Sequence, residues 1–355
     1  MALRRLQLNA FRNLETDGLE LDPRCNLVFG GNGSGKTNLL EAIHLVCSGK
    51  SFRTSKLNDC IAYDQDQFLV RGELGLYQAG IQRTRSETRI RVEGRDIQRV
   101  SELAGRTAVA VLNESGFDLL CGSPQYRRSF IDWIVFHVEH RFAEVWRGYN
   151  RVVRQKNELL KKGVRGEQLR LWNDQLIEYG VAVQAFRKNY IQRVNQRLES
   201  LPRADRFDGP IEIQYNPGWS HQDPVKALLT SMEKELKLKY SLQGAHRDRL
   251  VFLEGGKQVC GNHSRGQLRK TAMMCHLTAV ELVSELGEKP LIVLLDDLEA
   301  ELDNEAIDHL LSVLVSCNAQ VFISNIRQRD YVSGFFKEYK MFHVEHGMIR
   351  ALENT

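Results

Sequence analysis

Eight consecutive residues near the N-terminus could bind phosphate. Residues 30–37 read Gly-Gly-Asn-Gly-Ser-Gly-Lys-Thr and match the pattern G-x-x-x-x-G-K-[ST] at every position. Glycines let backbone N–H groups curl around phosphate oxygens, and the positive end of a following helix adds to the attraction. We expect Lys36 to reach the β- and γ-phosphates of a nucleotide and the Thr37 hydroxyl to ligate Mg²⁺. The predicted nucleotide-binding residues of this loop are Gly30, Gly31, Asn32, Gly33, Ser34, Gly35, Lys36 and Thr37.

The loop alone does not distinguish a kinase, a GTPase, a helicase or an ABC-type ATPase, so a second motif must decide. Residues 291–295 form an unbroken apolar run, typical of a central strand buried on both faces, and Asp296 and Asp297 follow it directly. Carboxylates at the end of such a strand lie beside a phosphate loop, so we expect Asp296 to hold the Mg²⁺ shell. Asp297 stands where an ABC-type ATPase places the carboxylate that orients the attacking water. The alternative is an acidic turn that caps the next helix.

A short Ser-x-Gly-Gln sequence lies between these motifs. Ser264, Arg265, Gly266 and Gln267 precede apolar residues at helical spacing. The pattern is weak by itself, but its position about thirty residues before the carboxylate strand resembles the signature of ABC-type ATPases, which completes the site of the opposite subunit. We therefore expect Ser264 and the start of its helix to bind the γ-phosphate held by a second copy, in a site that only a dimer completes.

Other positions could contribute to the same site. Residues 300–303 occupy the place of the D-loop, so Asp303 is expected to cross the dimer interface. Arg12 corresponds to a basic residue that related ATPase heads use near the nucleotide. Ser324 is either a γ-phosphate sensor or a buried strand end, and Glu114 is either a metal-side group or an exposed loop acid.

The elements that must position these residues follow from hydrophobic periodicity. Residues 3–29 read as short strands, and the loop at 30–37 is followed by apolar residues at helical spacing. Residues 68–100 alternate around glycines as antiparallel hairpins do, whereas residues 126–200 read as long helices.

The helical segment carries the positive charge of the protein. Residues 141–200 contain thirteen Lys and Arg against six Asp and Glu. We expect Arg151, Arg154, Lys161 and Lys162 to contact DNA phosphates, although a solvated helix face is the alternative.

The composition limits the partners, metal sites and cellular location that can be expected. The net charge of +4 over 355 residues is compatible with a polyanionic partner but does not require one. The seven cysteines are scattered without a C-x-x-C pair, which indicates reduced, mostly buried thiols and no zinc site. Charges interrupt every apolar stretch before it reaches the roughly 18 residues of a membrane span, and the N-terminus lacks a signal core, so we expect a cytoplasmic protein.

Taken together, these motifs resemble the RecF family over essentially the whole chain. The resemblance is carried by Phe11-Arg12-Asn13, residues 30–38, Ser51-Phe52-Arg53, residues 126–132, Gly244-Ala245-His246-Arg247-Asp248, residues 264–267 and residues 296–303. Three positions depart from the family pattern: Ala245 replaces the usual proline, Arg249 a common acid, and Ala300 a D-loop serine. The motif Tyr126-Arg127-Arg128 either supports the helical segment or touches phosphate.

The resemblance implies an α/β fold, an ABC-type phosphate-loop ATPase head with a mixed sheet, antiparallel strands and an inserted α-helical arm. The head would comprise residues 1–122 and 241–355, and the arm residues 123–240. It also implies ATP and Mg²⁺ as cofactors, an ATP-dependent homodimer, binding to double-stranded DNA at junctions with single strands, and cooperation with RecR and RecO in loading RecA. The corresponding role is in DNA replication, recombinational repair and the SOS response to DNA damage.

We expect hydrolysis, if any, to be weak and DNA-stimulated, because Asp297 is one methylene shorter than the glutamate common at its position and would orient water less well. The nucleotide would then act as a timer that releases the dimer. Two alternatives remain: a non-hydrolysing adaptor fixed in shape by nucleotide, and the ATPase subunit of a transporter.

Overall fold

The computed structural model describes residues 2–75, 77–113, 117–201, 209–297, 304–328 and 330–352. Contacts divide the chain into two compact units, the first formed by Met1–Gly116 with Val280–Thr355 and the second by Phe117–Ala279. Residues 241–279, which the sequence assigns to the head, therefore pack within the second unit.

The first unit contains an antiparallel six-stranded sheet, which matches the hairpins predicted for residues 68–100. Its strands, in spatial order, are β2 (Leu14–Glu20), β1 (Leu3–Phe11), β4 (Gln67–Leu74), β5 (Tyr77–Thr84), β6 (Thr88–Val92) and β7 (Arg95–Ile97). Buried and exposed residues alternate along β4, so one face of the sheet packs on the core.

A second six-stranded sheet in this unit is mostly parallel. Its order is β15 (Met348–Leu352), β14 (Lys340–Glu345), β3 (Cys25–Phe29), β13 (Gln320–Asn325), β12 (Leu291–Leu295) and β8 (Ala108–Leu112). Only β15 runs antiparallel to its neighbour. All five residues of β12 are buried, as predicted for a central strand.

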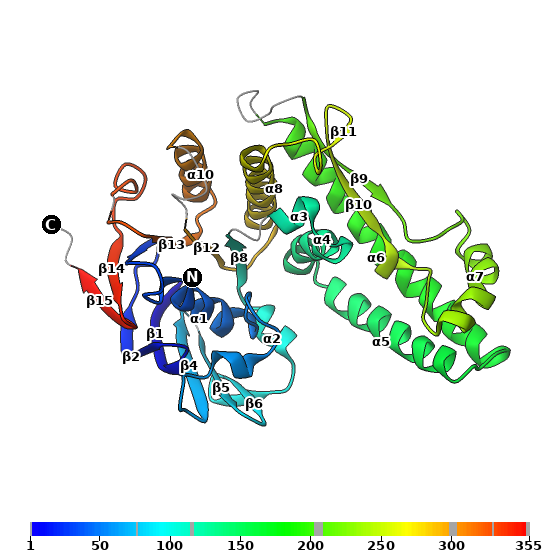
Figure 1. The fold of residues 1–355 in the computed structure, drawn as a ribbon, viewed down its shortest axis with the longest axis horizontal. Helices are drawn as coiled ribbons and strands as arrows, with labels where there is room; N and C mark the ends of the chain where they lie inside the picture. Colours follow the sequence, from blue (N-terminus) through cyan, green and yellow to red (C-terminus); the bar gives the residue numbers. More distant parts are fainter. Residues whose placement is uncertain are drawn as a thin grey trace. The chain divides into compact units, whose positions relative to one another are not determined.

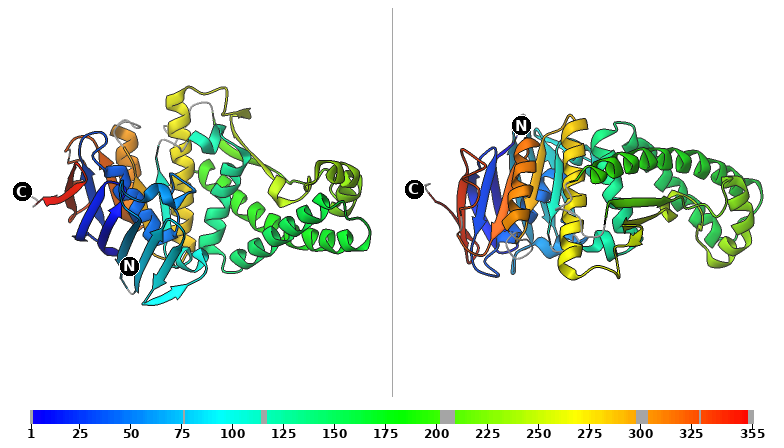
Figure 2. Two further views of the ribbon diagram at one scale, coloured as in Figure 1. Left: turned by 60° about the horizontal axis from the view of Figure 1, so that its bottom comes forward. Right: turned by 90° about the horizontal axis from the view of Figure 1, so that it is seen from above.

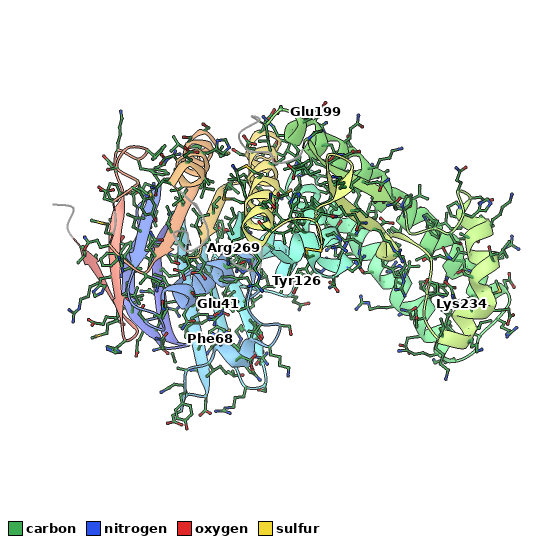
Figure 3. All side chains as sticks on the ribbon, turned by 45° about the horizontal axis from the view of Figure 1, so that its top comes forward. Glu41, Phe68, Tyr126, Glu199, Lys234 and Arg269 are labelled. Carbon is green, nitrogen blue, oxygen red and sulfur yellow. A yellow bond between two sulfur atoms is a disulfide. The ribbon has the colours of Figure 1, made fainter. Side chains whose placement is uncertain are left out.

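The helix α1 (Lys36–Ser48) packs against strands of both sheets (Figure 1). Leu39, Leu40, Ile43 and Val46 are fully buried in one core that also includes Phe68, which is labelled in Figure 3. This core fixes the start of α1, and with it the end of the phosphate loop. Among its described residues the unit also contains the 3₁₀ helix η1 (Leu57–Cys60) and the helices α2 (Val100–Ala104) and α10 (Asn304–Ser316).

The second unit is dominated by helices, as the sequence predicts for residues 126–200. They are α3 (Phe117–Cys121), α4 (Pro124–Val138), α5 (Phe142–Lys161), α6 (Glu167–Glu199), α7 (Pro224–Leu238) and the 3₁₀ turn η4 (Ala245–Arg247). The long helices α5 and α6 run side by side (Figure 2). A small sheet of β9 (Ile211–Asn216), β10 (Arg249–Glu254) and β11 (Lys257–Gln258) packs with them, and α8 (Arg265–Leu286) begins after β11.

Two cysteines of the second unit are joined. Cys121, at the end of α3, forms a disulfide with Cys260, which precedes α8. The expectation that all seven cysteines are reduced thiols is therefore wrong for this pair. Spacing could not reveal it, because 139 residues separate the two along the chain.

Buried charges also organise the second unit. Arg187 on α6 is paired at 2.8 Å with Asp132 and with Asp248, and Lys156 on α5 is paired at 2.8 Å with Glu235. These two basic residues therefore form ion pairs in the interior of the unit and do not add to its basic surface.

The predicted fold class is confirmed: the first unit combines a mostly parallel sheet, an antiparallel sheet and α1, and the helical unit lies between its two parts in the sequence. Within the described ranges, every helix falls short of the length or apolar character needed to cross a membrane.

Candidate nucleotide-binding site

The phosphate loop connects β3 to α1, as predicted. Gly33 and Gly35 have φ of 76° and 122°, backbone conformations that favour glycine. A Cβ on Gly33 would meet only open space, whereas one on Gly35 would lie 2.8 Å from Leu14 Cδ2. Gly33 therefore leaves the loop open to an approaching ligand, and Gly35 allows the loop to pack against β2.

The loop has the polar groups that a phosphate needs. Lys36 Nζ lies inside it and donates to the carbonyl oxygens of Gly30 and Gly31 at 2.8 and 3.0 Å. The buried Ser34 hydroxyl has no hydrogen-bond partner among the described residues. An unpartnered buried hydroxyl next to an ammonium group suits a ligand rich in oxygen, so the residues present fit the phosphates of a nucleotide.

The metal-side residues meet as the sequence predicts. Thr37 Oγ1 donates to the Asp296 carboxylate, with distances of 3.1 and 3.0 Å to its two oxygens. The two residues are 259 positions apart, and Asp296 follows β12, which β13 separates from β3. One hydroxyl and one carboxylate are ligands that Mg²⁺ accepts, usually with several waters retained.

Ser324, a fully buried residue of β13, positions this carboxylate. Its hydroxyl donates to Asp296 Oδ1 at 2.6 Å and accepts from the backbone N–H of Asp297 at 2.9 Å. Its burial fits the predicted strand end, and the γ-phosphate sensor role stays a prediction. Asp297 itself has φ of 58°, an uncommon conformation for a residue other than glycine, so the chain turns sharply after Asp296.

Beneath the loop, Glu41 of α1 joins several polar groups. The carboxylate, labelled in Figure 3, is fully buried and accepts two hydrogen bonds from Arg12, at 3.0 and 2.8 Å. Ser51 Oγ donates to it at 2.5 Å and Arg53 Nη1 at 3.3 Å. Arg12, predicted to bind nucleotide, thus braces α1 in this structure, and its nucleotide contact stays a prediction.

The ionised form of Glu41 is favoured by these contacts. Burial alone would raise the pKa of Glu41, but the hydrogen bonds from Arg12 and Ser51, with the charges of Arg12 and Arg53, hold the pKa below its usual value. The hydrogen bond to Glu41 likewise raises the pKa of Arg12. Glu41 was not predicted, because a single carboxylate within a helix shows no local pattern that distinguishes it from an exposed acid.

In the second unit, the signature-like sequence begins α8 with a capping box. The Gln267 side chain accepts the Ser264 N–H at 2.8 Å, and the Ser264 hydroxyl accepts the Gln267 N–H at 3.3 Å. Ser264, Arg265 and Gly266 are exposed, and a Cβ on Gly266 would meet open space. The first-turn N–H groups of Arg265 and Gly266 are beyond the reach of intrahelical carbonyls, so this helix start can receive an anion.

The predicted DNA-binding residues lie on the exposed face of α5. Arg151, Arg154 and Lys161 are exposed on this helix and Lys162 caps it, while Arg147 extends the same row. From Arg147 to Lys161 the row spans about 21 Å at 1.5 Å per residue. Within it Lys161 is engaged by Glu158 at 2.7 Å, in an exposed pair of little energetic weight.

Two other motifs of the second unit serve its interior. Arg127 donates to the carbonyl oxygens of Leu120 and Gly122, and Arg128 to that of Asp248. The Asp248 carboxylate also accepts hydrogen bonds from Gln184, Arg187, Tyr215 and the backbone of Gly218. Of the alternatives for Tyr126-Arg127-Arg128, the contacts of both arginines favour support of the helical unit.

Some predicted positions are not described. Glu114, Ala300 and Asp303 lie outside the described residues, so the D-loop prediction stays untested. Among the residues that are described, no three His, Cys, Asp or Glu side chains gather as a metal cluster.

The chain is similar in sequence to known proteins along almost its whole length. The model of the RecF/RecN/SMC N terminal domain family matches residues 2–350. The chain is 33% identical over 359 residues to the DNA replication and repair protein RecF of Pseudoalteromonas translucida, across 98% of this chain and 99% of that protein. It is 35% identical over 362 residues to RecF of Stutzerimonas stutzeri, across 99% of this chain and 98% of that protein.

Solved structures agree as well. A structure of the recombination mediator protein RecF-ATP in the RecFOR pathway superposes with a TM-score of 0.87 at 25% identity, covering 99% of this chain and 98% of that one. An Smc head bound to a domain of ScpA superposes with a TM-score of 0.60 at 13% identity, which shows a shared fold alone.

Fold and site together define a phosphate-loop protein built as an ABC-type ATPase head with an inserted helical unit. With the matches along almost its whole length, the chain belongs to the RecF family.

Proposed function

We propose that this protein is an ATP-dependent DNA-binding protein of replication and recombinational repair, in which ATP joins two copies into a dimer that clamps duplex DNA. The main support is the assembled half-site in the first unit, where Lys36 lies in the loop and the Thr37 hydroxyl meets Asp296. The RecF-ATP structure, similar over the whole chain, supports ATP as the nucleotide.

Each group of the half-site has one task. The loop N–H groups and Lys36 bind the phosphates, while Thr37 and Asp296 hold the Mg²⁺ shell. The bound ATP supplies a negatively charged γ-phosphate that groups of both copies can bind. Asp297 orients the attacking water, and its short side chain makes hydrolysis slow, so that the dimer persists before release.

The second half of the site comes from another copy. The capping box leaves Ser264 exposed at the start of a 22-residue helix, so its hydroxyl and the N–H groups behind it can meet a γ-phosphate held by Lys36 of the partner. The Ser264 hydroxyl can still donate to phosphate while it accepts from Gln267.

Dimerisation then brings two basic α5 rows to one DNA duplex. Contacts from Arg151, Arg154, Lys161 and Lys162 go to phosphates, which makes binding independent of sequence and sensitive to salt. We further propose that the protein acts in the cytoplasm near single-strand gaps and helps to load RecA. Family membership, with the similar RecF-ATP structure of the RecFOR pathway, supports RecO and RecR as its partners. It also favours this role over that of a transporter subunit.

A non-hydrolysing adaptor remains the second candidate, because Asp297 is shorter than the common glutamate. Phosphate release measured with and without duplex DNA separates the two. A switch ATPase releases phosphate slowly and faster with DNA, whereas an adaptor releases none under either condition.

The dimer is tested by two single variants. Lys36→Ala should abolish ATP binding, whereas Ser264→Ala should bind ATP yet stay monomeric in sedimentation. The shared site would be refuted if Ser264→Ala dimerised with ATP as the unchanged protein does.

The DNA surface is tested by salt dependence. Charge reversal at Arg151 and Arg154 removes two phosphate contacts per copy, so the slope of log K against log salt should fall by about 2 per copy. Arg85→Glu, at an exposed arginine of the first unit that forms an ion pair with exposed Asp66, is the control. An unchanged slope in the Arg151 and Arg154 variant would show that this face of α5 is only solvated and does not contact DNA.

A further inference from the structure

Two exposed cysteines lie close to the signature-like sequence. Cys121 and Cys260 form a disulfide with their Cα atoms 5.3 Å apart, within the usual range for such a bond. Both residues are exposed at the surface of the second unit, so reductants and oxidants in solution can reach them.

The remaining cysteines are less reactive toward oxidants. Cys25, Cys47, Cys60 and Cys275 are buried, and burial raises the pKa of Cys60 and of Cys275 to about 12. The thiolate is the reactive form of cysteine, so these thiols react slowly near neutral pH. Oxidation is thus directed to the pair Cys121 and Cys260, with half-buried Cys317 as a natural control.

The bond attaches the segment that leads into Ser264. Cys260 lies four residues before Ser264, in the turn between β11 and α8. The segment has other anchors, because the Val259 N–H donates to the Phe252 carbonyl at 3.0 Å and the buried His263 ring lies 3.0 Å from the Glu254 carboxylate.

The disulfide adds a covalent attachment at the start of this segment, to the end of α3. In the structure that carries this bond, Ser264 is exposed and its capping box is formed. The crosslinked state is therefore one in which the segment presents Ser264 to an incoming ligand.

We propose that Cys121 and Cys260 are a reversible thiol oxidation site whose disulfide fixes residues 260–264 in the presenting conformation and so strengthens ATP-dependent dimerisation. This inference rests on the proposed role of Ser264 in the site of a second copy. In the reduced protein the segment becomes ordered only when the dimer forms, which costs free energy. The disulfide orders the segment in advance and so removes this cost.

The chemistry is a thiol–disulfide exchange with a low-molecular-weight disulfide such as glutathione disulfide. The thiolate of one cysteine attacks a sulfur of the reagent, forms a mixed disulfide and releases one glutathione thiolate, which takes up the proton. The second cysteine attacks the mixed disulfide and releases the other glutathione. The two protein thiols are oxidised, and one glutathione disulfide is reduced to two thiols.

The test compares the full chain after dithiothreitol and after glutathione disulfide. Mass spectrometry detects the peptide that links Cys121 to Cys260, hydrogen exchange follows residues 261–268, and sedimentation gives the ATP concentration for half-dimerisation. Cys317→Ser keeps the pair and serves as the control, whereas Cys121→Ser with Cys260→Ser removes it.

In the oxidised protein we expect the linked peptide and slower hydrogen exchange at residues 261–268. The ATP concentration for half-dimerisation should be about fivefold lower, which corresponds to the free energy of immobilising one rotamer-rich side chain per copy in advance. The double serine variant should show no redox effect, and Cys317→Ser the full effect. The proposal is overturned if no linked peptide forms, or if it forms and the ATP concentration is unchanged or higher.

If neither redox form dimerises with ATP, the proposed function fails, and the regulatory part of this inference fails with it. The linked peptide and slower exchange at residues 261–268 would still establish the oxidation site itself.

Discussion

Replacement of the buried carboxylate beneath the phosphate loop should destabilise the protein strongly. In Glu41→Gln the shape is kept, but the charge and one acceptor oxygen are lost. The carboxylate accepts two hydrogen bonds from Arg12 and others from Ser51 and Arg53. A glutamine would turn its NH₂ group toward at least one of these donors, and the Arg12 guanidinium would lose its counter-ion.

The size of the effect follows from burial. The Glu41 side chain is fully buried and that of Arg12 is 20% exposed. Breaking a buried ion pair costs about 3–5 kcal/mol, and the partial exposure of Arg12 places the expected loss near the lower end, about 3 kcal/mol. For a domain of about 150–250 residues this lowers Tm by about 6–12 °C.

The assay is thermal unfolding of both proteins across pH, followed by circular dichroism. The pKa of Glu41 is lowered in the folded protein, so its stabilisation is fully present above the unfolded pKa of about 4.3 and is lost as the pH falls through the folded pKa. The difference in Tm between the two proteins should therefore shrink below about pH 4.

The matched control is Arg53→Gln, because Arg53 contacts the same carboxylate from a side chain that is 43% exposed. Its loss should cost no more than about 1 kcal/mol. The reasoning is refuted if Glu41→Gln lowers Tm no more than this control, or if the difference in Tm does not change with pH.

Two further predictions concern the water-orienting carboxylate and the helical unit. Asp297→Glu should speed phosphate release about tenfold, because the longer side chain positions water better; an unchanged or lower rate would remove Asp297 from that role. Lys156→Met should lower the free energy of unfolding in urea by about 3–5 kcal/mol, since it leaves Glu235 buried without a counter-charge. Adding Glu235→Leu should recover most of that loss, and Lys161→Met, at an exposed pair, should cost under about 1 kcal/mol. Equal losses of unfolding free energy in the Lys156 and Lys161 variants would show that the Lys156–Glu235 pair contributes no more than an exposed pair.

The phosphate loop and its carboxylate were predictable because their signals are local. The loop is a contiguous motif with its own flanking strand and helix, and the apolar run before Asp296 identifies a central strand. The meeting of Thr37 and Asp296 across 259 positions then follows from a general rule, since parallel strands end at the same edge of a sheet.

The buried charges were not predictable from a charge count, which treats every lysine and arginine alike. Their helical positions carry a usable signal. Lys156 shares a face with Val152 and Leu160, and Arg187 shares one with Val183, so both lie on buried stripes. Their partners, and the partner of Cys121, come from distant segments that no local pattern identifies.

The most direct test of the shared nucleotide site mixes two inactive variants. Neither Lys36→Ala nor Ser264→Ala should form an ATP-dependent dimer alone, but a mixed pair contains one intact site, built from Lys36 of one copy and Ser264 of the other. Sedimentation of the equimolar mixture with ATP should show dimers in which each variant, carrying its own fluorescent label, is present once. If the mixture stays monomeric while the unchanged protein dimerises, or if either variant dimerises alone, the two copies do not share their sites.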